Sequence, residues 1–157
     1  MKKQLFLIIP ALILNGCAST KVAYEYTDLS VTQSEMQTTK WKQLIRFPAM
    51  YPRQAVMKSL EGCATVEYVI TPQNEIKDIK VVKTTNSYFA DAAANVVKKW
   101  KWSDLPKNII TKPVKTQTRF DFCFDSPNQE CALVEPSYSC PGEDLIFSSG
   151  RIIKTSM

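Results

Sequence analysis

The chain has 157 residues, a formal net charge of +5 at pH 7 and no histidine. This length suits one ordinary domain with tails, and the modest, dispersed positive charge argues against nucleic acid as a partner. The absence of histidine excludes Ser-His-Asp and Cys-His catalysis and the His-Glu-x-x-His zinc motif. With only four glycines, the sequence also has no Gly-rich phosphate loop. We therefore expect no enzymatic activity, no cofactor and no bound metal.

The N-terminus has the pattern of a bacterial lipoprotein signal peptide. Residues 1–3 include two lysines, residues 5–14 form an apolar run, and Gly16 stands directly before Cys17. A membrane-spanning anchor is the alternative, but this run is shorter than the roughly 20 residues that a bilayer requires. We predict that residues 1–16 are removed, that Cys17 is lipidated, and that the mature protein is held on a membrane and faces the periplasm.

The residues after Cys17 predict where the protein is sorted and how it is tethered. Ala18 and Ser19 follow the cysteine without an Asp, which favours the outer membrane over the inner membrane. Residues 18–40 are polar, so we interpret residues 17–47 as the lipidated N-terminus and a flexible tether. Whether the segment Val22–Tyr26 docks on the domain as an extra strand stays open at this point.

Four cysteines remain after Cys17 is assigned to the lipid, namely Cys63, Cys123, Cys131 and Cys140. An even number of cysteines in an oxidising compartment predicts two disulfides. A four-cysteine zinc site is the alternative, but no Cys-x-x-Cys pair occurs and the spacings do not resemble a zinc ribbon or finger.

Residues 51–83 predict a short helix followed by a β-hairpin. Residues 51–62 suit a helix, with Pro52 in its first turn and Gly62 placed to end it in a left-handed cap. Residues 64–70 alternate between apolar and polar side chains, and residues 76–83 form a second strand after a turn that contains proline and asparagine.

An apolar stripe then predicts a longer helix. Its members recur at helical spacing and are Phe89, Ala92, Ala93, Val96, Val97 and Trp100. We expect Trp100 and Trp102 in the core, because a large aromatic side chain at the end of such a stripe buries well. Residues 114–124 alternate again and predict a third strand.

Several short motifs resemble the C-terminal domain of the TonB family of periplasmic proteins. They are Tyr51-Pro52 followed by Ala55, Glu61-Gly62 before the first strand, Ala92-Ala93, Trp100-Lys101-Trp102, and Lys112-Pro113-Val114. The resemblance implies an α+β fold in which a three-stranded antiparallel sheet packs against helices. We expect this domain at residues 48–124 and a cysteine-containing C-terminal extension at residues 125–157.

The resemblance also implies a partner-binding edge. In the energy transducers of the family, the last strand pairs with a short motif of an outer-membrane receptor, which is β-strand addition. The corresponding residues here are Val114, Lys115, Thr116, Gln117, Thr118, Arg119, Phe120, Asp121 and Phe122. The partner would be an envelope protein or a receptor peptide. The alternative is an ordinary edge strand that is kept soluble by Lys115, Gln117 and Arg119.

Two non-enzymatic functions remain open. One is a peptide-binding module with a link to TonB-dependent transport, and the other is a structural envelope lipoprotein that uses the fold as a scaffold. The energy transducers of the family carry a transmembrane helix and a proline-rich spacer that this sequence does not show, so we expect no energy transduction. Residues 145–153 resemble a small hairpin. If the extension covers the edge at residues 114–122, strand addition there is blocked. The partner and the oligomeric state stay open.

Strand parity predicts how the cysteines pair. The third strand runs antiparallel to the first, so Cys63 at the start of one and Cys123 at the end of the other lie on the same face. We therefore predict a disulfide between Cys63 and Cys123 and a second one between Cys131 and Cys140.

Overall fold

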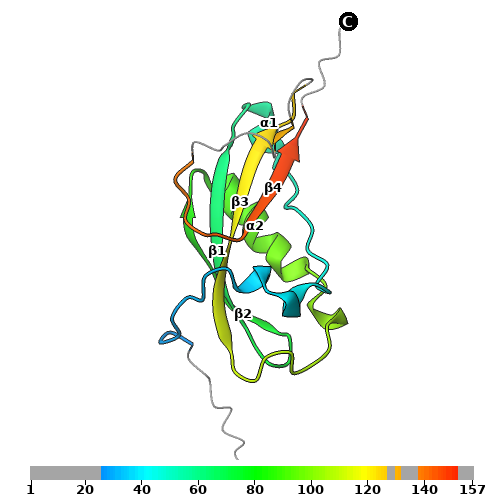
Figure 1. Ribbon diagram of the computed structural model, residues 1–157. Helices are drawn as coiled ribbons and strands as arrows, with labels where there is room; N and C mark the ends of the chain where they lie inside the picture. Colours follow the sequence, from blue (N-terminus) through cyan, green and yellow to red (C-terminus); the bar gives the residue numbers. More distant parts are fainter. Residues whose placement is uncertain (1–25, 127–129, 132–137, 152–157) are drawn as a thin grey trace, which may run out of the picture.

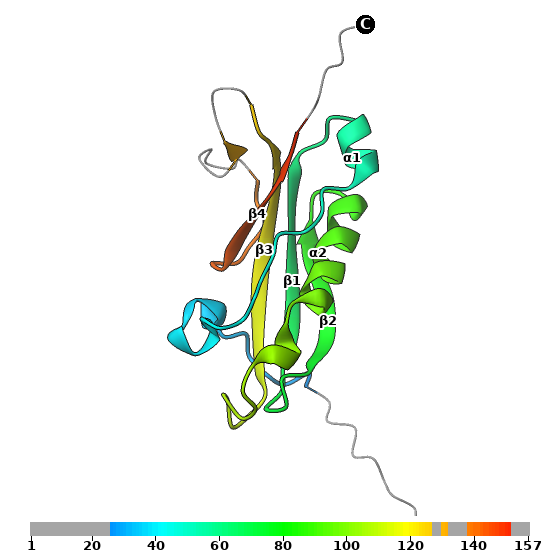
Figure 2. The same ribbon diagram turned by 90° about the vertical axis from the view of Figure 1, so that its right-hand side faces the viewer.

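The computed structural model describes residues 26–126, 130–131 and 138–151, so the signal peptide and Cys17 lie outside the described residues. One sheet of four strands, in the order β2-β1-β3-β4, carries the long helix α2 on one of its faces (Figure 1). Seen from the side, the sheet and α2 form two layers (Figure 2). None of the helices in the described part of the chain is long and apolar enough to cross a bilayer.

The sheet is mixed. Strand β1 (Gly62–Ile70) lies between β2 (Ile76–Thr84) and β3 (Val114–Phe124) and runs antiparallel to both. Strand β4 (Leu145–Gly150) lies beside β3 and runs parallel to it. The prediction of a three-stranded antiparallel sheet is therefore wrong in the number of strands. The predicted hairpin in the extension is a single strand as far as residue 150, because alternation of side chains identifies a strand but not its neighbour.

Helix α2 (Ser87–Lys99) forms where the apolar stripe predicts it. The side chain of Asn86 caps its N-terminus by accepting a hydrogen bond from the Tyr88 amide, 3.0 Å away. Two lysines in the last turn interact favourably with the negative end of the helix dipole. The buried face of the helix consists of Phe89, Ala93, Val96 and Val97.

The first helix is shorter than predicted. Helix α1 (Arg53–Met57) ends before Ser59, which takes the left-handed conformation with a φ of 50°. Gly62 is the first residue of β1 and not the helix cap. A side chain at Gly62 would collide with Thr85 and with the Phe89 ring, 2.9 Å from the position of a Cβ atom. Glycine is therefore needed there for close packing of β1 against the start of α2.

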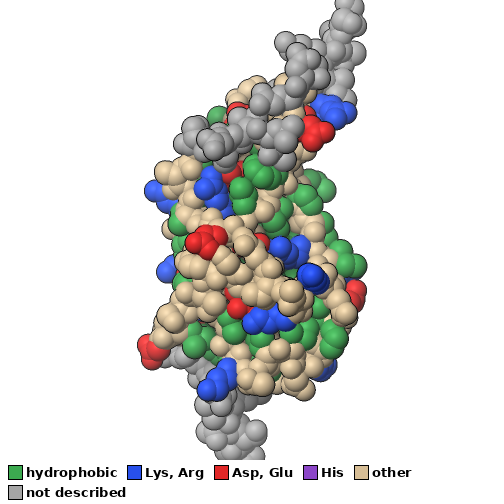
Figure 3. Space-filling view, viewed as in Figure 1, with side chains coloured by type: hydrophobic (Ala, Val, Ile, Leu, Met, Phe, Trp, Pro, Cys, Tyr) green, Lys and Arg blue, Asp and Glu red, His purple; other side chains and the backbone are tan. Residues whose placement is uncertain are grey.

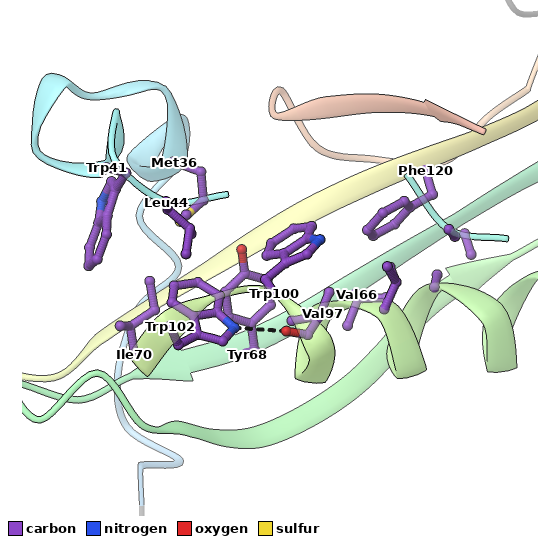
Figure 4. Packing of buried hydrophobic residues seen from close by; sticks show 14 of the residues in the cluster. Met36, Trp41, Leu44, Val66, Tyr68, Ile70, Val97, Trp100, Trp102 and Phe120 are labelled. Atoms are coloured by element: carbon purple, nitrogen blue, oxygen red, sulfur yellow. Dashed lines mark hydrogen bonds between the residues drawn. The ribbon is translucent and has the colours of Figure 1, made fainter. Parts of the chain in front are cut away.

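The core lies between the sheet and α2. The inward residues of β1 are fully buried, as the alternation predicts, and they are Ala64, Val66, Tyr68 and Ile70. Trp100 and Trp102 are 3% and 5% exposed, which confirms their prediction as core residues. Figure 4 shows both indoles packed beside Tyr68, with the Trp102 indole N–H donating to the carbonyl of Val97 at 2.8 Å.

The segment before the domain is part of this core. Two short 3-10 helices, η1 (Glu35–Gln37) and η2 (Thr39–Trp41), lie beside β3 (Figure 1). Trp41 is 2% exposed and meets Trp102 edge to face, with 6.3 Å between the ring centroids. The interpretation of residues 17–47 as a flexible tether is therefore wrong for residues 26–47. A few large apolar side chains within a polar sequence are enough to dock this segment.

The disulfides pair differently from the prediction. Cys63 is bonded to Cys140, and Cys123 is bonded to Cys131. Cys63 and Cys123 do share a face of the sheet, but Cys63 lies opposite Asp121, two residues from Cys123 along β3. Such a diagonal separates the two Cα atoms by about 8 Å, which is beyond disulfide range. The segment that leads into β4 crosses this face and brings Cys140 to Cys63 instead.

Candidate functional site

The candidate site is the outer edge of β3, the side of that strand that faces away from β1; we call it the β3 edge. The Arg119 amide donates outward to the carbonyl of Asp144 at 2.8 Å, and the Lys115 carbonyl accepts from the Thr32 amide at 2.8 Å. Backbone groups of a strand point alternately to its two neighbours, so the odd-numbered residues of β3 present their N–H and C=O groups at the β3 edge. Thr118 points its backbone toward β1.

The side chains of the predicted site divide between the two faces of the sheet. Thr116, Thr118, Phe120 and Phe122 point toward the helix layer and are fully buried. Lys115, Gln117, Arg119 and Asp121 lie on the opposite face. The nine predicted residues, with Val114 at the start of the strand, therefore form one continuous segment, but only part of it can present side chains to a partner.

Strand β4 occupies the C-terminal half of the β3 edge. The pairing runs from Arg119 opposite Leu145 to Phe124 opposite Gly150. A further backbone hydrogen bond, from the Asp125 amide to the Gly150 carbonyl at 2.8 Å, closes the end of the ladder. A partner strand cannot pair with this part of β3 while β4 is in place.

The N-terminal segment covers the start of the β3 edge, at Lys115. Val31 forms a parallel bridge with Lys115, and the Thr116 hydroxyl donates to the Thr32 carbonyl at 3.0 Å. The Lys115 ammonium also donates to the carbonyl of Thr27 at 3.2 Å. The edge predicted at residues 114–122 as a free binding site is thus occupied, at Lys115 and from Arg119 onward, by the chain segments that precede and follow the domain.

An ion pair supports the opposite face of β3. The Arg119 guanidinium makes two hydrogen bonds to the fully buried carboxylate of Asp121, at 2.7 and 2.9 Å. It also donates to the carbonyls of Cys140 and Tyr138. Arg119 therefore does not act as an exposed charge that protects an edge; it attaches the segment before β4 to the sheet.

A buried polar chain joins the two closing segments through the core. The Asp144 carboxylate, 3% exposed, accepts from the Thr118 hydroxyl and from Arg46, both at 2.6 Å. Thr118 in turn shares a 2.9 Å hydrogen bond with the Tyr68 hydroxyl. Burial raises the pKa of Tyr68 well above its ordinary value. No pattern in the sequence marks Arg46 and Asp144, since single charges in loops carry no periodic signal.

A separate hollow of about 720 Å³ lies between the β1–β2 turn and the C-terminal end of α2. Trp100, Trp102, Lys98 and Asn74 are among its lining residues. Asn74 uses its amide group to hold the loop after α2, donating to the carbonyl of Leu105 at 3.0 Å. Its position in the turn, with a φ of 62°, gives this residue an ordinary structural role.

Comparisons with known proteins agree with the sequence motifs. Residues 48–124 match the family described as the Gram-negative bacterial TonB protein C-terminal. Among solved structures, the solution structure of Helicobacter pylori TonB-CTD is 26% identical and covers 46% of this chain and 77% of its own, with a TM-score of 0.39. The Pseudomonas aeruginosa TonB CTD is 22% identical over 50% of this chain and 82% of its own, with a TM-score of 0.40. No curated protein matches the sequence.

Proposed function

Because residues 48–124 belong to the family of TonB C-terminal domains, we propose that this protein is a lipid-anchored, periplasm-facing interaction module that binds an extended segment of another envelope protein. The binding mode is strand addition on the β3–β4 side of the sheet. The observation that carries this proposal is the difference between the two sides of the sheet, of which only one is protected against an incoming strand.

The β2 side carries the features that prevent strand addition. Two register shifts mark bulges in the pairing of β2 with β1, and Asp78 has a φ of 48°. The bulges place Lys77, Lys80 and Lys83 on one face of this edge strand, since each pairs with an outward-facing residue of β1. Bulges and lysines on an edge strand disfavour pairing with a further strand.

The β3–β4 side carries no such protection. Strand β4 contains no charged residue and no proline. The carbonyls of Asp144 and Gly150 face β3, so the alternate residues Leu145, Phe147 and Ser149 turn their backbone groups away from it. Within the described residues, no backbone hydrogen bond reaches these outward groups. In Figure 3 the charged side chains are scattered over the visible face, which favours backbone pairing over charge as the basis of recognition.

Site-specific photocrosslinking in the native envelope tests this proposal. A photoreactive residue at Ser149, which is exposed on the β3–β4 side, should capture a specific protein. The same residue at Lys80, which is exposed on the β2 side, is the matched control and should not. Capture from Lys80 alone, or from neither position, would contradict the proposal. Identification of the captured protein as an outer-membrane receptor would extend the function to TonB-dependent transport.

The lipid anchor is a separate part of the proposal. It is supported by the apolar run and the Gly16-Cys17 junction, and Ala18 and Ser19 after the cysteine favour the outer over the inner membrane. A Cys17→Ser change should leave an unprocessed or a soluble protein. If a processed Cys17→Ser protein stayed in the membrane fraction, the protein would be held there by something other than lipid.

The second candidate function is a structural envelope lipoprotein. It is favoured by one observation, the closed β3 edge, whose covering segment is tied to the neighbouring strand β1 by the Cys63–Cys140 disulfide. Such a scaffold needs no partner strand. It predicts no specific crosslink from Ser149, so the same experiment separates the two functions.

A further inference from the structure

We propose that the β3 edge is a strand-binding site whose occupant exchanges. The chain's own Asp144–Gly150, which we call the resident strand, is an imperfect ligand of this site, and a partner strand of the pattern Asp-x-aliphatic-x-Ala-x-Gly replaces it. This inference rests on the proposed function in assuming that the partner supplies an extended segment. The contacts of the resident strand define the pattern position by position.

The first position requires aspartate. The Asp144 carboxylate is almost fully buried and accepts hydrogen bonds from the Thr118 hydroxyl and the Arg46 guanidinium, both at 2.6 Å. Its main-chain carbonyl accepts from the Arg119 amide at the same point of the edge. A residue without a carboxylate here would leave a guanidinium and a buried hydroxyl without their acceptor.

The last position requires glycine. A Cβ atom at Gly150 would lie 2.8 Å from a ring carbon of Tyr51 and 3.0 Å from the ring of Phe124. Those two rings are stacked on each other, with 4.8 Å between their centroids, so they cannot easily separate. Any larger residue at this register would push the strand away from β3.

The two middle positions face the core. Ile146 lies opposite Phe120 and packs against the hydrophobic core, so an aliphatic residue fits there. Ser148 is 1% exposed, and its hydroxyl has no hydrogen-bond partner among the described residues. A buried hydroxyl without a partner weakens the interaction, so alanine at this register should bind about fivefold more tightly or better. The resident strand is therefore not the best ligand for its own site.

The Cys63–Cys140 disulfide explains why the site is closed and yet exchangeable. Cys140 precedes the resident strand by four positions, and its bond to Cys63 of β1 keeps the strand next to the β3 edge. The strand itself lies outside the disulfide-closed loop and is free to leave. A strand on such a short tether has an effective concentration in the millimolar range or above. Free peptides compete poorly with it. A partner strand held at the same membrane surface also has a high effective concentration and can therefore compete.

Amide hydrogen exchange of the mature chain measures exchange of the resident strand directly. The Arg119 amide donates to the resident strand, and the neighbouring Phe120 amide faces β1. If the resident strand leaves while the rest of the sheet stays folded, Arg119 should exchange at least about tenfold faster than Phe120. A Ser148→Ala variant should slow the exchange of Arg119 by about fivefold and leave Phe120 unchanged. Equal protection of the two amides would show that β4 is a permanent strand and would overturn the proposal.

Peptides with the resident sequence identify the ligand pattern. The probe is Glu-Asp-Leu-Ile-Phe-Ala-Ser-Gly-Arg, which is residues 143–151 with alanine at the Ser148 position. At millimolar concentration the probe should bind to the mature chain. A Gly150→Val variant of the chain should bind the probe at least about tenfold more tightly, because the variant's resident strand no longer fits the β3 edge. A probe with valine in place of its glycine should not bind, and a probe with alanine at the exposed Ser149 position should bind as well as the first.

The outcomes separate this inference from the proposed function. Release of the resident strand when the probe binds, seen as faster exchange of its own inward-facing Ile146 and Ser148 amides or as a shifted Asp144 signal, supports replacement. Binding that leaves the resident strand in place would mean that the probe adds outside β4; this overturns the inference and leaves strand addition on this side intact. Failure of every probe to bind would overturn the inference, and the crosslinking from Ser149 would still test the proposed function.

Discussion

Arg46 and Asp144 lie 98 positions apart in the sequence, yet the Arg46 guanidinium is 2.6 Å from the Asp144 carboxylate. Arg46 precedes the family domain, and Asp144 follows it. Arg46 also lies over the Trp100 ring, 5.5 Å from its centroid, which fixes the arginine against the core. This pair therefore connects the two segments that close the β3 edge to each other and to the helix layer.

The first prediction concerns this ion pair. Arg46→Gln should lower the free energy of unfolding by about 2–3 kcal/mol, because it leaves the buried Asp144 carboxylate without a cation. Urea denaturation of the single variants and of the double variant with Asp144→Asn gives the coupling energy. Lys77→Gln, which breaks the exposed pair with Glu75, is the control and should not change stability measurably. An equal effect of the two changes would mean that the Arg46 pair is not structurally important.

The second prediction concerns the disulfides. Chymotryptic digestion, after Phe, Tyr and Leu, should link residues 61–68, which contain Cys63, to residues 139–145, which contain Cys140. Residues 123–124, which contain Cys123, should be linked to residues 125–133, which contain Cys131. On the chain-entropy model, loss of the Cys63–Cys140 bond costs about 4.5 kcal/mol and loss of the Cys123–Cys131 bond about 2.5 kcal/mol, both as upper figures. A linked pair of fragments with Cys63 and Cys123 would contradict the pairing seen here.

The third prediction concerns the start of β1. Gly62→Ala should destabilise the protein by about 1–3 kcal/mol, since the added methyl group meets Thr85 and Phe89. Ser59→Gly should act in the opposite direction, because glycine adopts the left-handed conformation of Ser59 without strain and stabilises by up to about 1 kcal/mol. Thermal unfolding of both variants is the measurement. Stabilisation by Gly62→Ala would show that β1 does not approach α2 as closely as described.

The fourth prediction concerns alkaline pH. Burial raises the pKa of Tyr68 in the folded state above its unfolded value of about 10. The folded state then holds this proton more tightly, so the stabilisation is complete below about pH 10 and decreases as the pH rises above it. Urea denaturation between pH 8 and 11 should show this loss. The slope should be smaller for Tyr68→Phe, which also costs about 1 kcal/mol at neutral pH through the lost bond to Thr118.

Tyr138 provides the comparison for that experiment. Its pKa is raised to about 12, mainly by partial burial. Tyr138→Phe should therefore reduce the alkaline slope between pH 8 and 11 about as much as Tyr68→Phe does, because both tyrosines keep their proton in the folded state over this range. An unchanged slope in both variants would show that burial of these tyrosines is not the cause of the loss.

The elements of the family domain follow from local patterns. The stripe from Phe89 to Val97 forms one helix, with Trp100 directly after its end, and residues 114–124 form one strand with the predicted bounds, because each buries one side of a regular element. The motifs at Tyr51-Pro52 and Trp100-Lys101-Trp102 identify the same family as the comparison does. The existence of four further cysteines also predicts two disulfides, which the structure contains.

Sequence alone therefore determined the long helix and the three antiparallel strands within residues 62–124, which of their faces are apolar, and which family the domain resembles. Only the tertiary structure decided that β4 runs parallel to β3, that residues 26–47 dock on the domain, and that Cys63 bonds to Cys140. The periodic spacing of apolar residues depends only on neighbours along the chain, so it identifies which face of a helix or strand must be buried. The partner of that face, and the occupant of the β3 edge, depend on which distant segments fit the same space, through contacts such as those of Asp144 and Gly150.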